Sequence, residues 1–388
     1  MNLIACAGGS GALCGKGRMA ESESDAIAVV GREAVLVPVF AVGLLAFAFR
    51  AQLSAQGALA ALVVAALLIA AIMVVSVRIA HHAEVLAAKV GDPYGTMILT
   101  LSAVLVEVVI LLIIMSESSS PTLARDTIFS AVMLDINGIL GLSALLGGWK
   151  FGEQAYNDDS GKTYGAMIMT AMGISMVVPE FVPSAQWHAY SVFTILAMVM
   201  LYWVFLRNQI GVHSYFFNYS YPDKKRANNR KPADEPFLPS LIFLIGEIVL
   251  VGLLAEVMSG FMSAGLKAIS APLGIAALIV ATMSAAPEMF TALRAALSNR
   301  MQVVINIALG ASLSTVILTV PVIEAAALIW GQPINMAMTP VQTVLAAITL
   351  IVAAINLNDG ETNAIEGMTH FVLFATFLAL AFLGIAGG

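Results

Sequence analysis

Two glutamates lie inside long apolar stretches of this sequence, where a charged side chain needs a physical reason. Glu107 has no Lys or Arg within 15 residues on either side, and Glu288 directly follows Pro287 in the stretch SAAPEMFTALRAALSNR. Near the middle of a lipid bilayer a carboxylate costs at least about 2.5–3.5 kcal/mol, and more without a partner. We therefore interpret Glu107 and Glu288 as the metal- and proton-binding residues of one shared site. The alternative is a pair of protonated, hydrogen-bonded carboxyl groups with a structural role.

The residues around these glutamates could supply an oxygen-only cation site. Pro287 has no N–H to donate, so we expect it to break the helix and free a carbonyl about one turn earlier. Ser284 and Thr282 lie near that turn, and Thr100 lies two turns before Glu107. Carbonyl, hydroxyl and carboxylate oxygens are the ligands that hard cations such as Ca²⁺ prefer. Removal from water favours the neutral form of a carboxyl group. Each glutamate can then hold a proton or a metal ion but not both, and this competition predicts an exchanger.

Other polar residues in apolar stretches extend the candidate site. Asn306 and Ser312 lie in the apolar stretch after Glu288, and we expect both to line the same cation and proton site. Ionisable residues within a membrane are functional candidates by default. Four further acids are therefore candidates for a proton path, with a structural role as the alternative for each: Asp135, Glu324, Glu247 and Glu256.

Two adjacent histidines, His81 and His82, precede Glu84 in the sequence HHAE. A metal site is disfavoured here, because neighbouring side chains on a helix point in different directions. We expect a solvated helix end. A pH-sensing role for the two histidines is the alternative hypothesis, since an unperturbed imidazole has a pKa of about 6.5.

The composition places these residues in a membrane protein. Of the 388 residues, 60% are hydrophobic and 11% are charged, whereas soluble globular proteins carry about 25% charged residues. A membrane-spanning helix needs about 20 apolar residues, and eleven stretches approach or exceed that length. The predicted fold class is an all-α integral membrane protein with about eleven transmembrane helices, at residues 35–49, 57–79, 95–115, 127–148, 163–182, 189–206, 238–258, 272–293, 303–329, 337–356 and 365–386.

The distribution of basic residues predicts the orientation. With these eleven spans, 15 of the 18 Lys and Arg residues fall on the side that holds the N-terminus. Cytoplasmic loops carry the excess of Lys and Arg. The N-terminus is therefore predicted to be cytoplasmic and the C-terminus to lie outside, which requires an odd number of helices.

The predicted helices divide into a first helix and two halves of five. The longest polar stretch, NYSYPDKKRANNRKPADEP, separates the halves. Because five is odd, the halves have opposite orientations, as in the inverted repeats of secondary transporters. The second helix of each half opens with a similar motif, PYG or PLG, and contains Glu107 or Glu288. The predicted division is a disordered cytoplasmic tail at 1–34, a first helix at 35–55, a first repeat at 56–209, a cytoplasmic linker at 210–237 and a second repeat at 238–388.

The predicted tail contains both cysteines, Cys6 and Cys14. Their context shows neither metal-site spacing nor a disulfide framework. Met19 is an alternative start of the chain.

Three stretches resemble the calcium/proton antiporters of the cation/proton exchanger family, over roughly residues 65–388. HHAEVLAAKVGDPYGTMILTLSAVLVEVVI is similar to the family's first repeat and includes Glu84 and Glu107. SAAPEMFTALRAALSNRMQVVINIALGASLSTVILTVPV is similar to its second repeat and includes Glu288, and NDGETNAIEGMTHFVLFATFLALAF is similar to its last helix. The resemblance implies eleven helices in the bacterial cytoplasmic membrane. It also implies export of Ca²⁺ in exchange for H⁺ by alternating access at the paired glutamates.

The sequence also departs from part of that family. Plant and fungal members carry GNA.E in each repeat and a His directly after the second Glu, whereas Met289 follows Glu288 here. The match is closer to bacterial antiporters that also handle Na⁺ or K⁺. A Na⁺(K⁺)/H⁺ antiporter of the same fold is therefore the alternative function.

Two further function classes are less consistent with the sequence. A channel is disfavoured because no filter-like loop is present, and buried carboxylates in an inverted repeat favour alternating access. An intramembrane enzyme would need a signature such as HExxH or GxSxG, and the sequence contains neither. The expected partners are membrane lipids and the transported inorganic cations, Ca²⁺ or Na⁺ and K⁺, with H⁺. No cofactor and no nucleic acid are expected, and the oligomeric state stays open.

Overall fold

The computed structural model describes residues 33–91, 94–117, 120–210, 214–217, 236–331 and 334–387. The predicted tail, except Glu33 and Ala34, lies outside the described residues, as do Pro93 and most of the predicted linker. The α-helices up to the linker are α2 (Leu36–Ala48), α3 (Arg50–Ala55), α4 (Ala58–Val90), α5 (Tyr94–Glu117), α6 (Leu123–Met133), α7 (Gly141–Phe151), α8 (Asp158–Met172) and α9 (Trp187–Ile210). Those after it are α10 (Phe237–Ala268), α11 (Leu273–Ala296), α12 (Met301–Ser314), α13 (Val320–Trp330), α14 (Pro340–Asn356) and α15 (Ala364–Phe382).

The shorter elements connect or interrupt these helices. Three π-helical segments are η2 (Leu134–Leu140), η3 (Gly173–Val177) and η8 (Thr315–Thr319). The 3₁₀ turns are η1 (Glu33–Val35), η4 (Val178–Phe181), η5 (Ser184–Gln186) and η6 (Ser214–Phe217). Two short antiparallel strands, β1 (Gln154–Ala155) and β2 (Glu361–Thr362), pair with each other.

The prediction of an all-α membrane protein is confirmed. Among the described residues, nine helical stretches are long and apolar enough to cross a membrane, and two shorter apolar helices lie at Glu33–Ala48 and Pro340–Asn356. These stretches coincide with the predicted spans. The count of eleven crossings stays a prediction, because the two shorter helices are below the usual spanning length. Helices α4 and α10 run about ten residues past the predicted ends at 79 and 258.

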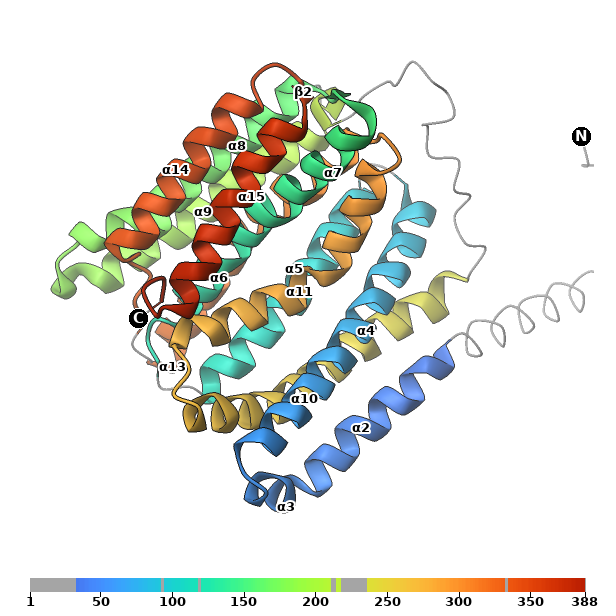
Figure 1. Cartoon of the computed structure of the whole chain (residues 1–388), viewed down its shortest axis with the longest axis vertical. Coiled ribbons are helices and arrows are strands. Elements are labelled where there is room, and N and C mark those ends of the chain that lie inside the picture. The colour runs from blue at the N-terminus through green and yellow to red at the C-terminus, as the bar shows by residue number, and fades with distance from the viewer. Residues whose placement is uncertain are drawn as a thin grey trace, which may run out of the picture.

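The helices pack as two groups that meet at α5 and α11. Figure 1 shows α2, α4 and α10 on one side, α14, α15, α8 and α9 on the other, and α5 with α11 between them. One buried apolar cluster includes Ile110 of α5 and Met283 of α11, and a second includes Leu111 and Ala285 of the same two helices. The helices that carry Glu107 and Glu288 therefore contribute to both packed bodies.

In each predicted repeat, one π-helical segment interrupts the third helix. Segment η2 lies between α6 and α7, and η8 lies between α12 and α13. A π-helical turn adds a residue to the helical repeat, and such turns occur frequently at functional sites. The two segments therefore mark corresponding places in the two predicted halves.

Helices α7 and α15 approach each other very closely. A Cβ atom at Gly148 would collide with the backbone of Ala364, and one at Gly367 would collide with the backbone of Leu145. Small residues permit such contacts between membrane helices. Asn363 caps the start of α15. Its side-chain oxygen accepts hydrogen bonds from the backbone N–H of Ile365 at 2.9 Å and of Glu366 at 3.2 Å, which satisfies donors that a helix start leaves unpaired.

The predicted helix break at Pro287 is wrong. Helix α11 continues without interruption from Leu273 to Ala296, with Pro287 inside it. Packing of α11 against α4, α5 and α6 holds the helix together on both sides of the proline. Pro287 still lacks the N–H that would bond to the carbonyl of Met283, one turn earlier.

Candidate functional site

Glu107 lies on α5 and is held by hydroxyl groups from the other half of the chain. Its side chain is 7% exposed. Its Oε2 accepts hydrogen bonds from Thr315 Oγ1 at 2.9 Å and from Thr319 Oγ1 at 3.3 Å. Both threonines belong to η8, whose π-helical turn brings them to one carboxyl group. Within the described part of the chain, no donor reaches the second oxygen, Oε1, so that oxygen is available to a proton or a cation.

Asp135 lies on η2 and makes the corresponding contact between the halves. The hydroxyl of Ser312, at the end of α12, donates a hydrogen bond to its Oδ2 at 3.2 Å. Both side chains are almost fully buried. The charge of Asp135 interacts with those of Glu288 and Glu107, so the three carboxyl groups form one electrostatic cluster. We call Glu107, Asp135 and Glu288 the carboxyl cluster.

Glu288 is half-buried on α11, and the two hydroxyls predicted beside it bond to their own helix. Thr282 donates to the carbonyl of Leu278 at 2.8 Å, and Ser284 donates to the carbonyl of Ala281 at 3.0 Å. Each hydroxyl oxygen keeps lone pairs that can bind a cation. Thr100 is half-buried on α5, about 10 Å along the helix axis from Glu107. Thr100 is therefore not part of the carboxyl cluster in this structure.

Asn306 lies apart from the carboxyl cluster. Its Nδ2 donates to the carbonyl of Phe217 at 2.8 Å, and its Oδ1 accepts from Gln302 Nε2 at 3.0 Å. Six residues of helix, about 9 Å, separate it from Ser312. The predicted role of Asn306 as a ligand is therefore not supported by its contacts, which connect α12 to η6 instead.

Glu324 is buried on α13, beyond η8. It interacts with the hydroxyl of Ser191 on α9. A cavity of about 30 Å³ lies here, and Tyr190 and Asn335 contribute to its lining. That volume has room for about one water molecule, and a role of Glu324 in a proton path stays a prediction.

The two acids of α10 have different environments. Glu247 is 1% exposed and faces α4 and η1, whereas Glu256 is exposed. Neither lies in the carboxyl cluster. The expectation that Glu256 lines an internal path is not supported, because its side chain faces away from the packed helices.

The expectation of a solvated helix end at the two histidines is wrong. His82 is fully buried and His81 is half-buried. Helix α4 continues to Val90, and α10 packs along it. The ring of His82 stacks on Phe243 of α10, with the ring centres 5.5 Å apart. The long α4–α10 contact explains the burial, which the polar sequence HHAE concealed.

A buried polar network beside η2 was not predicted from the sequence. Asn137 Nδ2 donates to Thr349 Oγ1 at 2.7 Å, and Asn137 Oδ1 lies 2.9 Å from His370 Nδ1. All three side chains are at most 2% exposed. The network connects η2, which carries Asp135, to α14 and α15. Thr315 and Thr319 were also not predicted as hydrogen-bond donors to Glu107.

Acidic residues gather around Tyr156 at the end of the molecule where β1 and β2 pair. Burial raises the pKa of the Tyr156 hydroxyl, and the charges of four nearby carboxyl groups raise it further: Asp359, Glu366, Asp158 and Glu361. The hydroxyl therefore stays neutral, and its oxygen lies 3.4 Å from the carbonyl of Glu361. One of these acids, Asp158, is paired with Lys162, so the acidic charge at this end is partly balanced.

The chain matches the family model described as sodium/calcium exchanger protein, over residues 60–211 and 239–383. It is 32% identical over 309 residues to the sodium-potassium/proton antiporter ChaA of Escherichia coli (strain K12), covering 78% of this chain and 84% of that protein. It is 23% identical over 288 residues to a Ca²⁺/H⁺ antiporter of Aphanothece halophytica, covering 70% of this chain and 76% of the relative.

The fold is also similar to a solved structure of native YfkE. The TM-score is 0.71 at 18% sequence identity, and the match covers 90% of this chain and 99% of the other. At this identity the match supports the arrangement of the helices and not the choice of ion.

Proposed function

Since the chain belongs to the sodium/calcium exchanger protein family, we propose that it exports Ca²⁺ in exchange for H⁺ at the carboxyl cluster. The observation that carries this proposal is the set of three neighbouring carboxyl groups, of which Glu107 and Asp135 are buried and accept hydrogen bonds from the opposite half of the chain. No enzyme chemistry is needed, because binding and conformational change suffice for exchange.

The hydroxyl groups around the carboxyl cluster can donate hydrogen bonds when no cation is bound and act as cation ligands when one is bound. Without a cation, Thr315 donates a hydrogen bond to Glu107, and Ser312 donates one to Asp135. A bound cation needs oxygen lone pairs, so each hydroxyl turns its proton away and presents oxygen to the ion. A proton on Glu107 removes the charge that attracts the cation. Proton and cation binding are thereby mutually exclusive, and this competition couples their transport.

The position of the carboxyl cluster supports alternating access, because the cluster lies where the two groups of helices meet. We propose that the chain contains an inverted repeat, with halves at 56–209 and 238–388. Two observations support it: the family model matches two separate ranges, and η2 and η8 interrupt corresponding helices. Movement of one body against the other opens the cluster to one side at a time. We also propose the bacterial cytoplasmic membrane as the location, with the N-terminus and the β1–β2 end on the cytoplasmic side.

Na⁺(K⁺)/H⁺ exchange is the second candidate function. The observation that favours it is the 32% identity to the sodium-potassium/proton antiporter of Escherichia coli. All-oxygen ligand sets also bind Na⁺ and K⁺, so the carboxyl cluster is compatible with either ion class.

Transport assays on proteoliposomes distinguish the two functions. The lumen is made acidic, then Ca²⁺, Na⁺ or K⁺ is added outside and the lumenal pH is followed. Alkalinisation by micromolar Ca²⁺ supports the Ca²⁺/H⁺ function. Alkalinisation by Na⁺ or K⁺ alone supports the second candidate, and no response to any of the three ions rejects both.

A further inference from the structure

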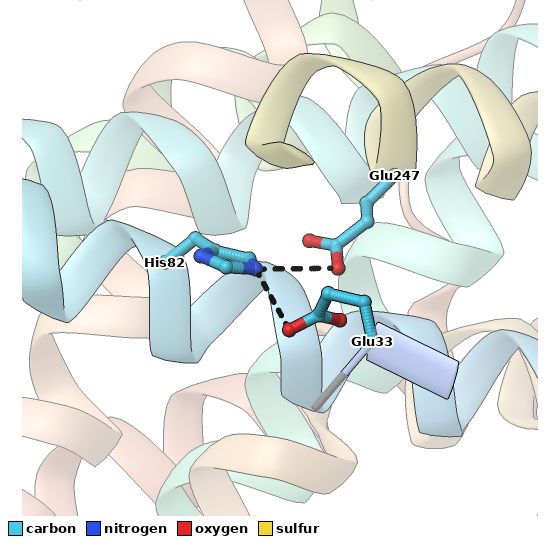
Figure 2. Close-up of side chains that lie close together, drawn as sticks. All are labelled: Glu33, His82 and Glu247. Atoms are coloured by element: carbon cyan, nitrogen blue, oxygen red, sulfur yellow. Dashed lines mark ion pairs between the residues drawn. The ribbon is translucent and has the colours of Figure 1, made fainter. Parts of the chain in front are cut away.

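A second cluster of ligand-forming side chains lies away from the carboxyl cluster. Glu33 of η1, His82 of α4 and Glu247 of α10 converge on one point, as Figure 2 shows. Their exposed fractions are 5%, 0% and 1%. One candidate ligand atom from each side chain lies within 4.8 Å of the other two, the only such group of three or more His, Cys, Asp or Glu among the described residues. We call these residues the Glu33–His82–Glu247 cluster.

The spacing of these atoms fits metal ligands better than hydrogen-bond partners. His82 Nε2 lies 3.3 Å from Glu33 Oε1 and 3.7 Å from Glu247 Oε1. Hydrogen bonds in proteins are mostly 2.7–3.2 Å long. Ligands of a tetrahedral Zn²⁺ lie about 2.0–2.2 Å from the ion, and tetrahedral angles then separate them by about 3.3–3.6 Å. The two separations from His82 Nε2 are close to this range, and the ligand atoms of Glu33 and Glu247 lie within 4.8 Å of each other.

The net charge of the Glu33–His82–Glu247 cluster and its surroundings favours a bound cation. Apart from the carboxyl group of Glu33, no polar side chain of the described chain lies within hydrogen-bond distance of either carboxyl oxygen of Glu247, although both are buried. Arg78 Nε donates to Glu33 Oε2 at 3.0 Å, and Arg78 Nη2 also contacts Glu33 Oε1. Two carboxylates and one guanidinium have a net charge of −1. A carboxylate has about four lone-pair sites, so Arg78 can orient Glu33 and still leave a site for a metal ion.

From this arrangement we propose that Glu33, His82 and Glu247 bind a divalent transition metal ion, with Zn²⁺ as the best fit. Imidazole nitrogen and carboxylate oxygen are both ligand types that Zn²⁺ uses in proteins, and three protein ligands leave the fourth position to water. Ca²⁺ and Mg²⁺ prefer oxygen ligands alone. The imidazole therefore separates this site chemically from the carboxyl cluster, and the proposal does not depend on the transported ion.

The site would connect three parts of the chain. Glu33 lies directly before α2, which packs on α4 and α10. His82 and Glu247 belong to α4 and α10, the first helices of the two proposed repeats. A bound Zn²⁺ joins these helices to each other and to the segment before α2. A metal ion held there stabilises the packing of these two helices against each other.

Zinc binding to the purified full-length protein tests the proposal. The protein carries Cys6→Ser and Cys14→Ser, to remove thiolate ligands, and is freed of metal with a chelator. Zn²⁺ is then titrated by calorimetry in the presence of excess Ca²⁺. We expect about one Zn²⁺ per chain, with the same affinity in a Glu107→Gln, Glu288→Gln variant, because that variant leaves the proposed site intact.

Variants of the cluster provide the decisive comparison. His82→Gln and Glu247→Gln are expected to weaken zinc binding by at least about 100-fold, since loss of even a ligand's hydrogen-bond partner typically costs 10–100-fold. The matched controls His81→Gln and Glu84→Gln lie on the same helix outside the cluster and are expected to bind normally. Unchanged binding in His82→Gln or Glu247→Gln, or no binding by the parent protein, overturns the proposal.

A second measurement applies if a cluster variant fails to fold. Zinc-edge X-ray absorption of the parent protein reports the ligand types without any substitution in the site. Scattering from one imidazole with oxygen neighbours supports the proposal. An oxygen-only zinc environment, or one with more than one imidazole, overturns it.

Discussion

The Oε2 atom of Glu107 accepts a hydrogen bond from Thr315 Oγ1 at 2.9 Å, although 208 residues separate them in the sequence. Glu107 belongs to the second helix of the first proposed repeat, and Thr315 to the third helix of the second. The carboxylate thus depends on both halves for its environment. Any movement of α5 relative to η8 changes the donors around Glu107, and with them the relative affinity for a proton and a cation.

Removal of the two hydroxyls of η8 tests their role as ligands. In a Thr315→Val, Thr319→Val variant the side-chain shape is kept and the oxygen atoms are lost. Hydrogen bonds to charged groups contribute about 1.5–3 kcal/mol, so we expect kcat/KM for the transported cation to fall about 10- to 100-fold in proteoliposomes. Thr170→Val is the control, because Thr170 is exposed and bonds only to its own helix at Ala166. Equal rates in the two variants would contradict the assignment.

Replacement of Pro287 tests whether the missing N–H matters. Helix α11 is already continuous there, so Pro287→Ala can form the absent hydrogen bond to Met283 without a change of fold. A proline within a helix costs about 3 kcal/mol, so we expect a higher melting temperature. We also expect weaker cation binding, because the Met283 carbonyl becomes occupied. A variant that is stabilised and transports normally would show that this carbonyl takes no part in the site.

The buried network of Asn137 and His370 is expected to stabilise η2. Asn137→Ala removes the partner of His370 Nδ1 and leaves Thr349 Oγ1 with only Met133 Sδ, and we expect this to cost about 1–3 kcal/mol of unfolding free energy. A double-mutant cycle with His370→Ala is expected to give a coupling energy of about 0.5–3 kcal/mol. Thermal unfolding in detergent measures both. Additive effects of the two substitutions would contradict a direct interaction.

The close packing of α7 and α15 predicts sensitivity to a single methyl group. Gly367→Ala places a Cβ atom against the backbone of Leu145, and overpacking of this kind costs about 1–3 kcal/mol. Gly165→Ala is the matched control, because no atom lies within 4 Å of its added Cβ. We expect a clear fall in melting temperature for Gly367→Ala and little change for Gly165→Ala. Similar melting temperatures for both variants would argue against the contact.

The sequence alone was sufficient to predict the features that depend on local composition. Apolar length located the helices, and carboxyl groups inside apolar stretches identified Glu107, Asp135 and Glu288. Thr319 and His370 were missed because their roles depend on contacts between distant segments. No local pattern indicates that η8 meets α5, or that His370 meets Asn137 across 233 residues.

The errors have a common physical origin. The sequence HHAE has the polarity of a solvated helix end, but the long contact of α4 with α10 buries His82 completely. Pro287 has the local signature of a break, but neighbouring helices hold α11 in one piece. In both cases tertiary packing overrides a local preference.

Proton release on cation binding tests the central claim most directly. The purified protein is placed in weakly buffered detergent solution, Ca²⁺, Na⁺ or K⁺ is added, and the protons released per bound cation are counted. We expect a fixed number of protons to be released per bound cation by the parent protein. The same number is expected for Glu256→Gln, because the Glu256 side chain is exposed. Both release and binding should be lost in Glu107→Gln and Glu288→Gln. Cation binding without proton release, or release that persists in both glutamate variants, would contradict a shared site for cation and proton.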